Sequence, residues 1–155
     1  CISKVAEHHI LCCLRPYISR YVADCQFGFL PGRGTSDALF HFVSATHNIL
    51  NKHSAALVTS LDIRRAFDKV VHNKLLDILC DIDIPFQLFQ LIHSYLTGRT
   101  QSVRIGTYSS SPVPITSGVP QGSVLGPSLF VLYFNSVLTN VSLSKSTRLF
   151  AYAGG

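Results

Sequence analysis

The chain has 155 residues, of which 47% are hydrophobic, so it can bury the core of about one domain and is not compositionally disordered. Its net charge of +5 is unevenly distributed, because residues 1–83 hold nine basic and all eight acidic residues whereas residues 84–155 hold four basic residues and no acidic one. A basic surface of this kind fits a polyanionic partner, although four scattered cations could equally be solvated surface groups.

The cysteines argue against two classes of small protein. They form an odd set without a C-x-x-C pair, which disfavours both a zinc ribbon and a disulfide framework and favours a reduced, intracellular protein. The longest apolar run, residues 129–134, is far shorter than the roughly 20 residues of a membrane span, so no membrane association is expected. No signal peptide is visible, and we expect both ends to be cut from a longer protein, because the chain begins at Cys1 and ends in two glycines after an apolar run.

The first third of the chain predicts two helices joined by a turn-rich loop. Apolar residues recur at helical spacing over residues 2–14, which predicts an amphipathic helix that ends before Pro16. The loop QFGFLPGRGTSDAL, residues 26–39, leads into a second helix that begins at about residue 35. Arg33 in this loop is flanked by glycines. It could contact a nucleic-acid backbone, or it could be one exposed cation in a plain glycine loop.

The middle of the chain contains an apolar run, residues 55–61, that ends abruptly in Asp62. The run is short, uncharged and followed by polar residues, which favours a buried strand over a helix. Asp62 would then lie at the mouth of that strand. Its carboxylate could cap a helix that begins near Arg64. Alternatively, it could bind Mg²⁺, whose sites usually draw on one or two carboxylates plus substrate phosphates.

The second half of the chain predicts helices and short extended segments in alternation. In order, we expect a helix from residue 75 to about 83, a helix over 87–96 that closes at Gly98, a hairpin over 101–116, a loop over 117–126, a helix from Pro127 or Ser128 to about Leu138, and a final strand over 148–153. No internal repeat or low-complexity linker divides the chain, so we expect a single unit.

The loop over residues 117–126 has a composition suited to close contact with another chain. Three glycines (Gly118, Gly122 and Gly126) allow the backbone to approach a neighbour, and two prolines stiffen the loop. Gln121 supplies an amide at its crest. The loop could therefore contact a nucleic acid, or it could be a helix-entry loop without a ligand.

Three blocks resemble reverse transcriptases of retrotransposons without long terminal repeats. LDIRRAFDKVVHNKLL, residues 61–76, resembles their first catalytic motif, SGVPQGSVLGPSLFVLYFN, residues 117–135, resembles their next palm motif, and the loop of residues 26–39 resembles their fingers segment. A mobile group II intron reverse transcriptase is the nearest relative to exclude, and the forms AFDKVVHNKLL and VPQGSVLGPSLF favour the retrotransposon side.

The resemblance implies an α+β fold, with the fingers and palm of a right-hand polymerase and a small antiparallel sheet packed against helices. Residues 1–155 would form one reverse transcriptase fragment, with fingers-side helices and loop over about residues 1–54 and the palm over residues 55–155. The family's N-terminal fingers strand and thumb would lie outside this chain. The implied partners are an RNA template, a DNA primer and deoxynucleoside triphosphates, in the cytoplasm and nucleus.

The resemblance also assigns roles to residues. Asp62 would be a ligand of Mg²⁺ or Mn²⁺, with the Ile63 carbonyl also facing a metal. Phe67 would crowd the sugar 2′-carbon, although it could instead be a core aromatic residue.

The resemblance also implies contacts with the substrates. Arg33 would belong to the substrate-binding residues, and the palm loop would lie against the template nucleotide and incoming base through Gly118, Gln121 and Gly122. For Asp68 and His72 we expect structural roles, such as satisfying backbone groups.

The chain departs from the family at its third palm motif. That motif reads F-A-D-D or Y-A-D-D, whereas this chain reads LFAYAGG, so Tyr152 and Ala153 stand where the two aspartates belong. No acidic residue follows Asp83. Asp62 alone would leave most of the charge of two dications unneutralised, and a tyrosine, with a reference pKa of about 10, is not an anion at pH 7. We therefore expect no polymerisation, which leaves a non-catalytic nucleic-acid-binding remnant or a product without function as alternatives.

Overall fold

The computed structural model describes residues 2–144 and 146–152, and within them it forms five α-helices and two short antiparallel ribbons. The helices are α1 (Ile2–Tyr21), α2 (Thr35–Leu50), α3 (His72–Asp81), α4 (Phe86–Leu96) and α5 (Gly126–Asn140), with a 3₁₀ turn at Phe67–Lys69. The ribbons pair β1 (Thr100–Gln101) with β4 (Val113–Pro114) and β2 (Arg104–Ile105) with β3 (Tyr108–Ser109). The α+β class is confirmed.

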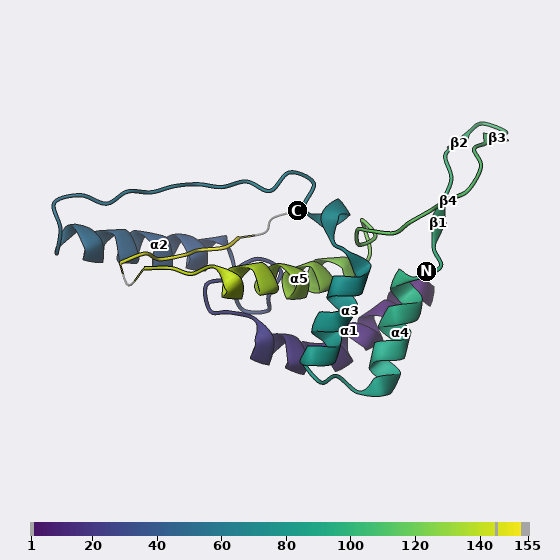
Figure 1. Cartoon of the computed structure of the whole chain (residues 1–155), viewed down its shortest axis with the longest axis horizontal. Coiled ribbons are helices and arrows are strands. Elements are labelled where there is room, and N and C mark those ends of the chain that lie inside the picture. Colours follow the sequence, from purple (N-terminus) through teal and green to yellow (C-terminus); the bar gives the residue numbers. More distant parts are fainter. Residues whose placement is uncertain (1, 145, 153–155) are drawn as a thin grey trace.

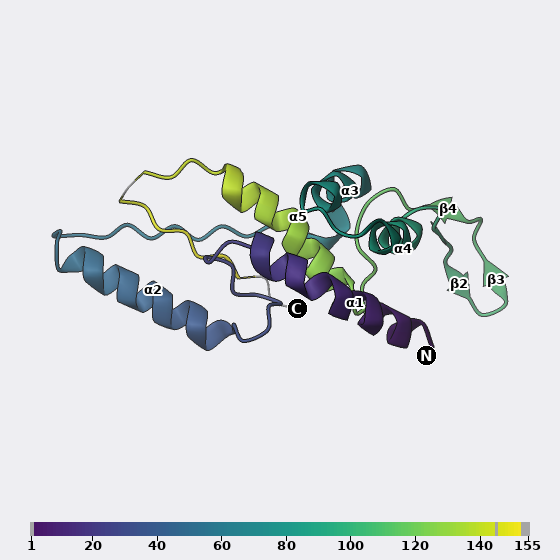
Figure 2. The same cartoon turned by 90° about the horizontal axis from the view of Figure 1, so that it is seen from below.

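Four helices, α1, α3, α4 and α5, pack together around the core, whereas α2 lies apart at the other end of the molecule (Figures 1 and 2). Each of the four presents one apolar face, with residues spaced three or four apart, to this core. The largest fully buried aliphatic side chains are Leu14, Leu75, Leu79, Ile92, Leu96, Leu125, Leu129 and Leu132. By contrast, α2 has no buried residue and leaves Leu39, Phe40 and Val43 exposed.

The first helix continues through Pro16 to Tyr21, so the prediction that it ends before the proline is wrong. Pro16 lies on the exposed side of α1, while Leu14 and Ile18 on either side of it are buried. A proline inside a helix costs about 3 kcal/mol. Burying these two side chains contributes about as much or more, so tertiary packing outweighs the local signal.

The buried strand predicted over residues 55–61 is also wrong. This segment runs extended from the end of α2 to the 3₁₀ turn, without a strand partner among the described residues (Figure 1). Leu57 is 95% exposed and Leu61 is 88% exposed. A strand needs a neighbour to accept and donate its backbone hydrogen bonds, and residues 2–144 and 146–152 supply none for this segment.

The final strand is reduced to a single bridge. Ala151 pairs in parallel with Gln26, where the Phe27 N–H donates to the Ala151 carbonyl (2.9 Å) and the Ala151 N–H donates to the Cys25 carbonyl (2.8 Å). The predicted small antiparallel sheet is present as the two ribbons. In the described part of the chain, however, these ribbons project outward with all strand residues exposed, so the sheet does not pack against the helices (Figure 1). The right-hand fingers and palm arrangement stays a prediction.

Two further properties bear on the protein's class. In the part of the chain that the structure describes, none of the helices combines the length and apolar character that crossing a bilayer would require. The described cysteines, Cys12, Cys13, Cys25 and Cys80, are free thiols. Burial raises the pKa of the Cys25 thiol above its ordinary value, which makes it less reactive than an exposed thiol.

A buried asparagine ties α5 to the end of α1. The Asn135 side chain is fully buried. Its Nδ2 donates to the Tyr21 carbonyl (2.9 Å), and its Oδ1 accepts from the Ala23 N–H (2.8 Å). One side chain therefore satisfies two backbone groups just where α1 ends, and this fixes how the chain leaves the helix core.

We expect Asn135→Leu to lower the free energy of unfolding by about 3 kcal/mol, because each backbone group left buried without a partner costs about 1–3 kcal/mol. Urea unfolding followed by circular dichroism measures the change. Asn140→Ala is the matched control, since Asn140 also bonds a carbonyl, that of Ser136 (2.6 Å), but on the surface. The control should change stability by less than about 0.5 kcal/mol, and equal losses in the two variants would contradict the assignment.

Candidate functional site

Two stretches far apart in the sequence, residues 67–72 and 117–121, lie side by side. The Gly118 N–H donates to the Val70 carbonyl (2.8 Å), and the Val119 N–H donates to the Phe67 carbonyl (3.1 Å). Val71 and Ser117 form an antiparallel bridge next to these bonds. The first palm-like block and the loop of the second are therefore joined through their backbones.

Gly118 makes this close approach possible. Its φ is +87°, a conformation that side-chain-bearing residues rarely adopt, and a Cβ there would lie 3.1 Å from Asp68 Cα and 3.2 Å from the Asp68 carbonyl oxygen. Gly122 also has a positive φ of +76°, but a Cβ there would meet nothing within 4 Å. The close contact predicted for this loop exists at Gly118, and the chain it contacts is the protein's own.

Two side chains reinforce the same junction. His72 is buried, and its Nε2 donates to the Gly118 carbonyl at 2.8 Å, which fixes the tautomer because a carbonyl can only accept. The Gln121 Nε2 donates to Asp68 Oδ1 at 3.2 Å. His72 thus satisfies a backbone group, as expected for a structural residue, whereas Asp68 binds a side chain.

A groove of about 540 Å³ opens beside this junction. Its lining includes Asp68, His72 and Gln121 at the junction, together with Arg99 and the base of the hairpin. The Arg99 guanidinium lies 5.4 Å from the centre of the Tyr95 ring and donates to the Tyr95 carbonyl (3.4 Å). Burial raises the pKa of the Tyr95 phenol, so the ring is neutral at pH 7 and a cation–π contact holds the arginine in place.

The sequence alone does not distinguish Arg99 from the other three basic residues of residues 84–155. The signal that could have found it is its position, directly after Gly98 closes α4 and before β1 begins. A cation fixed at the wall of a groove, in a half of the chain without acids, can attract phosphate groups.

Phe67 belongs to an aromatic cluster. Its ring stacks on Phe130 with centroids 4.6 Å apart and meets Phe29 edge-on at 5.8 Å. Phe67 is half-buried against the core. The contacts explain it as a packing residue, and its role beside a sugar stays a prediction.

Arg33 uses its guanidinium to hold its own loop. One nitrogen donates to the carbonyls of Ala23 (3.2 Å), Asp24 (3.3 Å) and Gln26 (2.9 Å), and the other forms an ion pair with Asp24 Oδ1 (3.1 Å). Its side chain is only 33% exposed. Contact with a nucleic-acid backbone would have to compete with these bonds.

The residues expected to hold metal do not form a cluster. Asp62 and Ile63 are exposed and lie in the extended segment before the turn, and no helix begins at Arg64, so the capping alternative for Asp62 is wrong. Tyr152 is 52% exposed, one residue after the Ala151 bridge, and Ala153 lies outside the described residues. Within residues 2–144 and 146–152, no three His, Cys, Asp or Glu side chains are grouped so as to hold a metal ion. A single exposed carboxylate does not fit a two-metal site.

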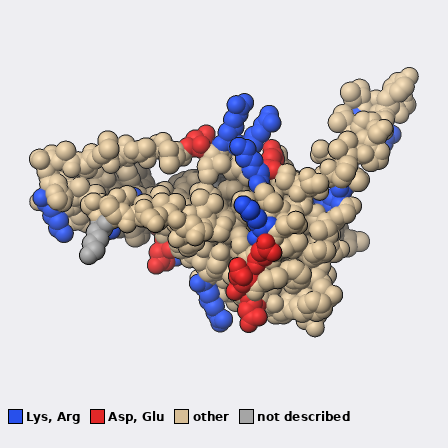
Figure 3. Space-filling model, in the orientation of Figure 1, with Lys and Arg blue, Asp and Glu red and all other residues tan. Residues whose placement is uncertain are grey.

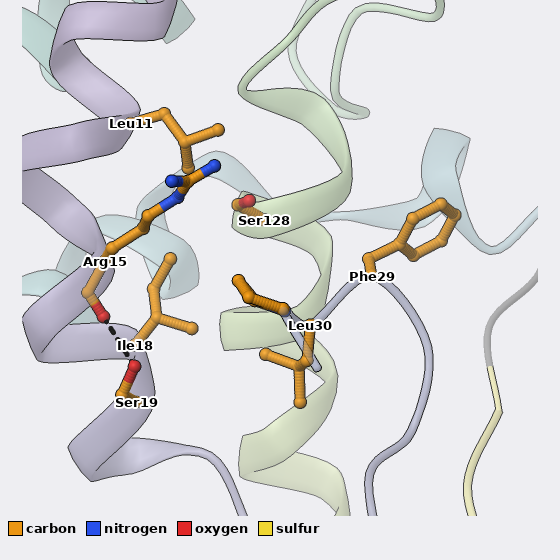
Figure 4. Close-up of a pocket in the computed structure, with 8 residues that line it drawn as sticks. Leu11, Arg15, Ile18, Ser19, Phe29, Leu30 and Ser128 are labelled. Atoms are coloured by element: carbon orange, nitrogen blue, oxygen red, sulfur yellow. Dashed lines mark hydrogen bonds between the residues drawn. The ribbon is translucent and has the colours of Figure 1, made fainter. Parts of the chain in front are cut away.

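A second, smaller pocket of about 130 Å³ lies between α1, the loop at Phe29 and α5. Figure 4 shows the Arg15 side chain reaching toward Ser128 while the Phe29 ring points away from the pocket. The Ser19 Oγ donates to the Arg15 carbonyl (3.0 Å) on α1. The walls are otherwise mostly apolar, and the pocket lies where the loop packs across two helices.

Comparison with known proteins agrees with these motifs. A family model described as reverse transcriptase (RNA-dependent DNA polymerase) matches residues 1–153. The chain is 34% identical over 128 residues to the RNA-directed DNA polymerase from mobile element jockey of Drosophila melanogaster, which covers 83% of this chain and 14% of that protein. The jockey protein of Drosophila funebris is 41% identical over 116 residues, covering 75% of this chain and 13% of that protein.

A third relative is the probable RNA-directed DNA polymerase from transposon X-element of Drosophila melanogaster. It is 36% identical over 129 residues, which cover 83% of this chain and 14% of that protein. The chain therefore spans only about one seventh of the length of the curated relatives it matches.

Proposed function

Since this chain belongs to the reverse transcriptase (RNA-dependent DNA polymerase) family, we propose that it derives from the fingers and palm of a retrotransposon reverse transcriptase. The parent protein would copy an RNA template into DNA by two-metal nucleotidyl transfer, extending a DNA primer with deoxynucleoside triphosphates in the presence of Mg²⁺ or Mn²⁺. Residues 1–54 would belong to the fingers side and residues 55–155 to the palm. The names of the relatives, RNA-directed DNA polymerases of mobile elements, support this parent reaction.

The chain itself would not polymerise. Tyr152 and Ala153 occupy the positions of the two aspartates, and no carboxylate follows Asp83 to replace them. Losing the ligands that clamp the metals forfeits several kcal/mol of transition-state stabilisation, which corresponds to several factors of ten in rate. Asp62 would remain as a metal ligand without its companions.

What the chain retains is a surface for nucleic acid. The parent protein would act in the cytoplasm and nucleus. The observation that carries this proposal is the junction at Gly118, which holds the loop of residues 117–122 at the edge of the groove. Gly118, Gln121 and Gly122 would face the template nucleotide, and Phe67, held in place by its neighbours, would lie toward the sugar of the incoming nucleotide. Arg99 would contact phosphate.

The chain should therefore bind an RNA–DNA hybrid, with an affinity that falls at least tenfold between about 50 and 200 mM salt, because phosphate contacts release counterions. Fluorescence anisotropy with a labelled hybrid measures this dependence. Arg99→Gln should reduce the slope of log K against log salt by about 1. Arg20→Gln, in the last turn of α1 and outside the groove, is the control and should leave the slope unchanged. Binding that does not respond to salt would reject the proposal.

A further inference from the structure

The hairpin of residues 100–114, which we name the arm, projects from the helices beyond α4 (Figures 1 and 2). Arg104 pairs with Ser109 and Ile105 pairs with Tyr108, so Gly106 and Thr107 form a two-residue turn. Gly106 has φ +60°, which suits the first position of such a turn. All eight strand residues are exposed.

Folding does not account for the side chains of the arm. β2 and β3 pair only with each other, and an isolated two-stranded hairpin is at best marginally stable in water. Nevertheless, Val103 is 66% exposed, Ile105 76% and Tyr108 83%. Ile105 and Tyr108 are directly opposite in register and therefore share a face. Large apolar side chains on a projecting element indicate an interaction surface.

The charges of the arm select the kind of partner. It contains Arg104 and no acidic residue, and seven of its fifteen residues carry hydroxyl groups. On the face shown in Figure 3, the surface of the arm includes a small basic area and no acidic one. Arginine and hydroxyl groups are common donors to phosphate oxygens, and an exposed tyrosine ring can stack on an unpaired base. A single-stranded nucleic acid offers both groups at once.

We propose that the arm binds the single strand that enters the groove, with Arg104 contacting a phosphate and Tyr108 stacking on a base. The position of the arm supports this path, because Gln101 and Pro114 at its base line the same groove as Gln121. A strand leaving Gln121 would pass directly onto the arm. This inference rests on the proposed function, and it adds a binding element outside the three blocks of residues 26–39, 61–76 and 117–135.

The arm can be shortened without touching the helices. The Ser110 N–H donates to the Val103 carbonyl (2.8 Å), so these two residues can flank a two-residue turn, and replacing residues 104–109 by Asn-Gly closes the hairpin there. The shortened chain should keep its circular dichroism spectrum and urea midpoint. Its affinity for a labelled oligouridylate of about 20 nucleotides should fall about tenfold or more, through loss of one stacked base and one phosphate contact.

Point variants make the test independent of the deletion. Tyr108→Ala should weaken single-strand binding severalfold and leave duplex DNA binding unchanged, and Arg104→Gln should lower the salt slope by about 0.7. Lys52→Gln, just after α2 at the opposite end of the molecule, removes the same charge and should leave affinity within about twofold (Figure 1). Unchanged single-strand binding by the arm variants would overturn this inference alone. Failure of the unaltered chain to bind any nucleic acid would overturn the proposed function as well.

Discussion

Replacing Gly118 by alanine is expected to lower the free energy of unfolding by about 3 kcal/mol. At φ +87° an alanine is strained by about 1–2 kcal/mol. In addition, its Cβ would lie 3.1 Å from Asp68 Cα, where backbone rather than a flexible side chain would have to move, at a further cost of about 1–3 kcal/mol. Urea unfolding measures the sum of the backbone strain and the cost of this close contact.

Gly122→Ala separates the two contributions. Gly122 has a similar φ of +76°, but a Cβ at this position would meet nothing within 4 Å, so only the backbone strain of about 1–2 kcal/mol remains. The difference between the two variants measures the contact between the loop and residues 67–72. If both variants lose the same stability, the two blocks are not held against each other as described.

The local signals in the sequence were sufficient for most helices and for the hairpin. The second helix was expected at about residue 35 and begins at Thr35, and the helix predicted over residues 87–96 is α4, Phe86–Leu96. Each of these elements is specified by its own periodicity and by the glycine or proline beside it. The hairpin likewise depends only on alternation around Gly106.

The errors concern elements whose conformation depends on distant parts of the chain. Residues 55–61 have a strand-like sequence, but a strand requires a neighbour that no local pattern supplies. The helix continues past Pro16 because residues of α4 and α5 bury its apolar face. In both cases packing, which the sequence does not display locally, decided the outcome.

The candidate site was predicted in part. The two motif blocks were identified, and the glycines indicated a close approach, but the bond from His72 to the Gly118 carbonyl joins residues 46 apart in sequence. Contact of Arg33 with a nucleic-acid backbone is a prediction from its charge and its flanking glycines. Its four bonds to Ala23, Asp24 and Gln26 depend on the fold of the loop and could not be read from composition.

Restoring the two aspartates is expected to have the largest effect on activity. With Tyr152→Asp and Ala153→Asp, three carboxylates including Asp62 could share the charge of two dications. Each factor of ten in rate corresponds to about 1.4 kcal/mol. Recovering several kcal/mol of transition-state stabilisation should therefore raise the rate of primer extension at least a thousandfold. Asp62→Asn in the restored sequence should abolish that gain, since it removes the remaining ligand.

The most direct measurement is primer extension by an active polymerase of the family in which the matching segment is replaced by residues 1–155 of this chain. We expect the unaltered graft to add no nucleotides to a DNA primer on an RNA template with Mg²⁺ or Mn²⁺, and the graft with both aspartates restored to extend it. Extension by the unaltered graft, at a rate near that of the restored one, would contradict the account.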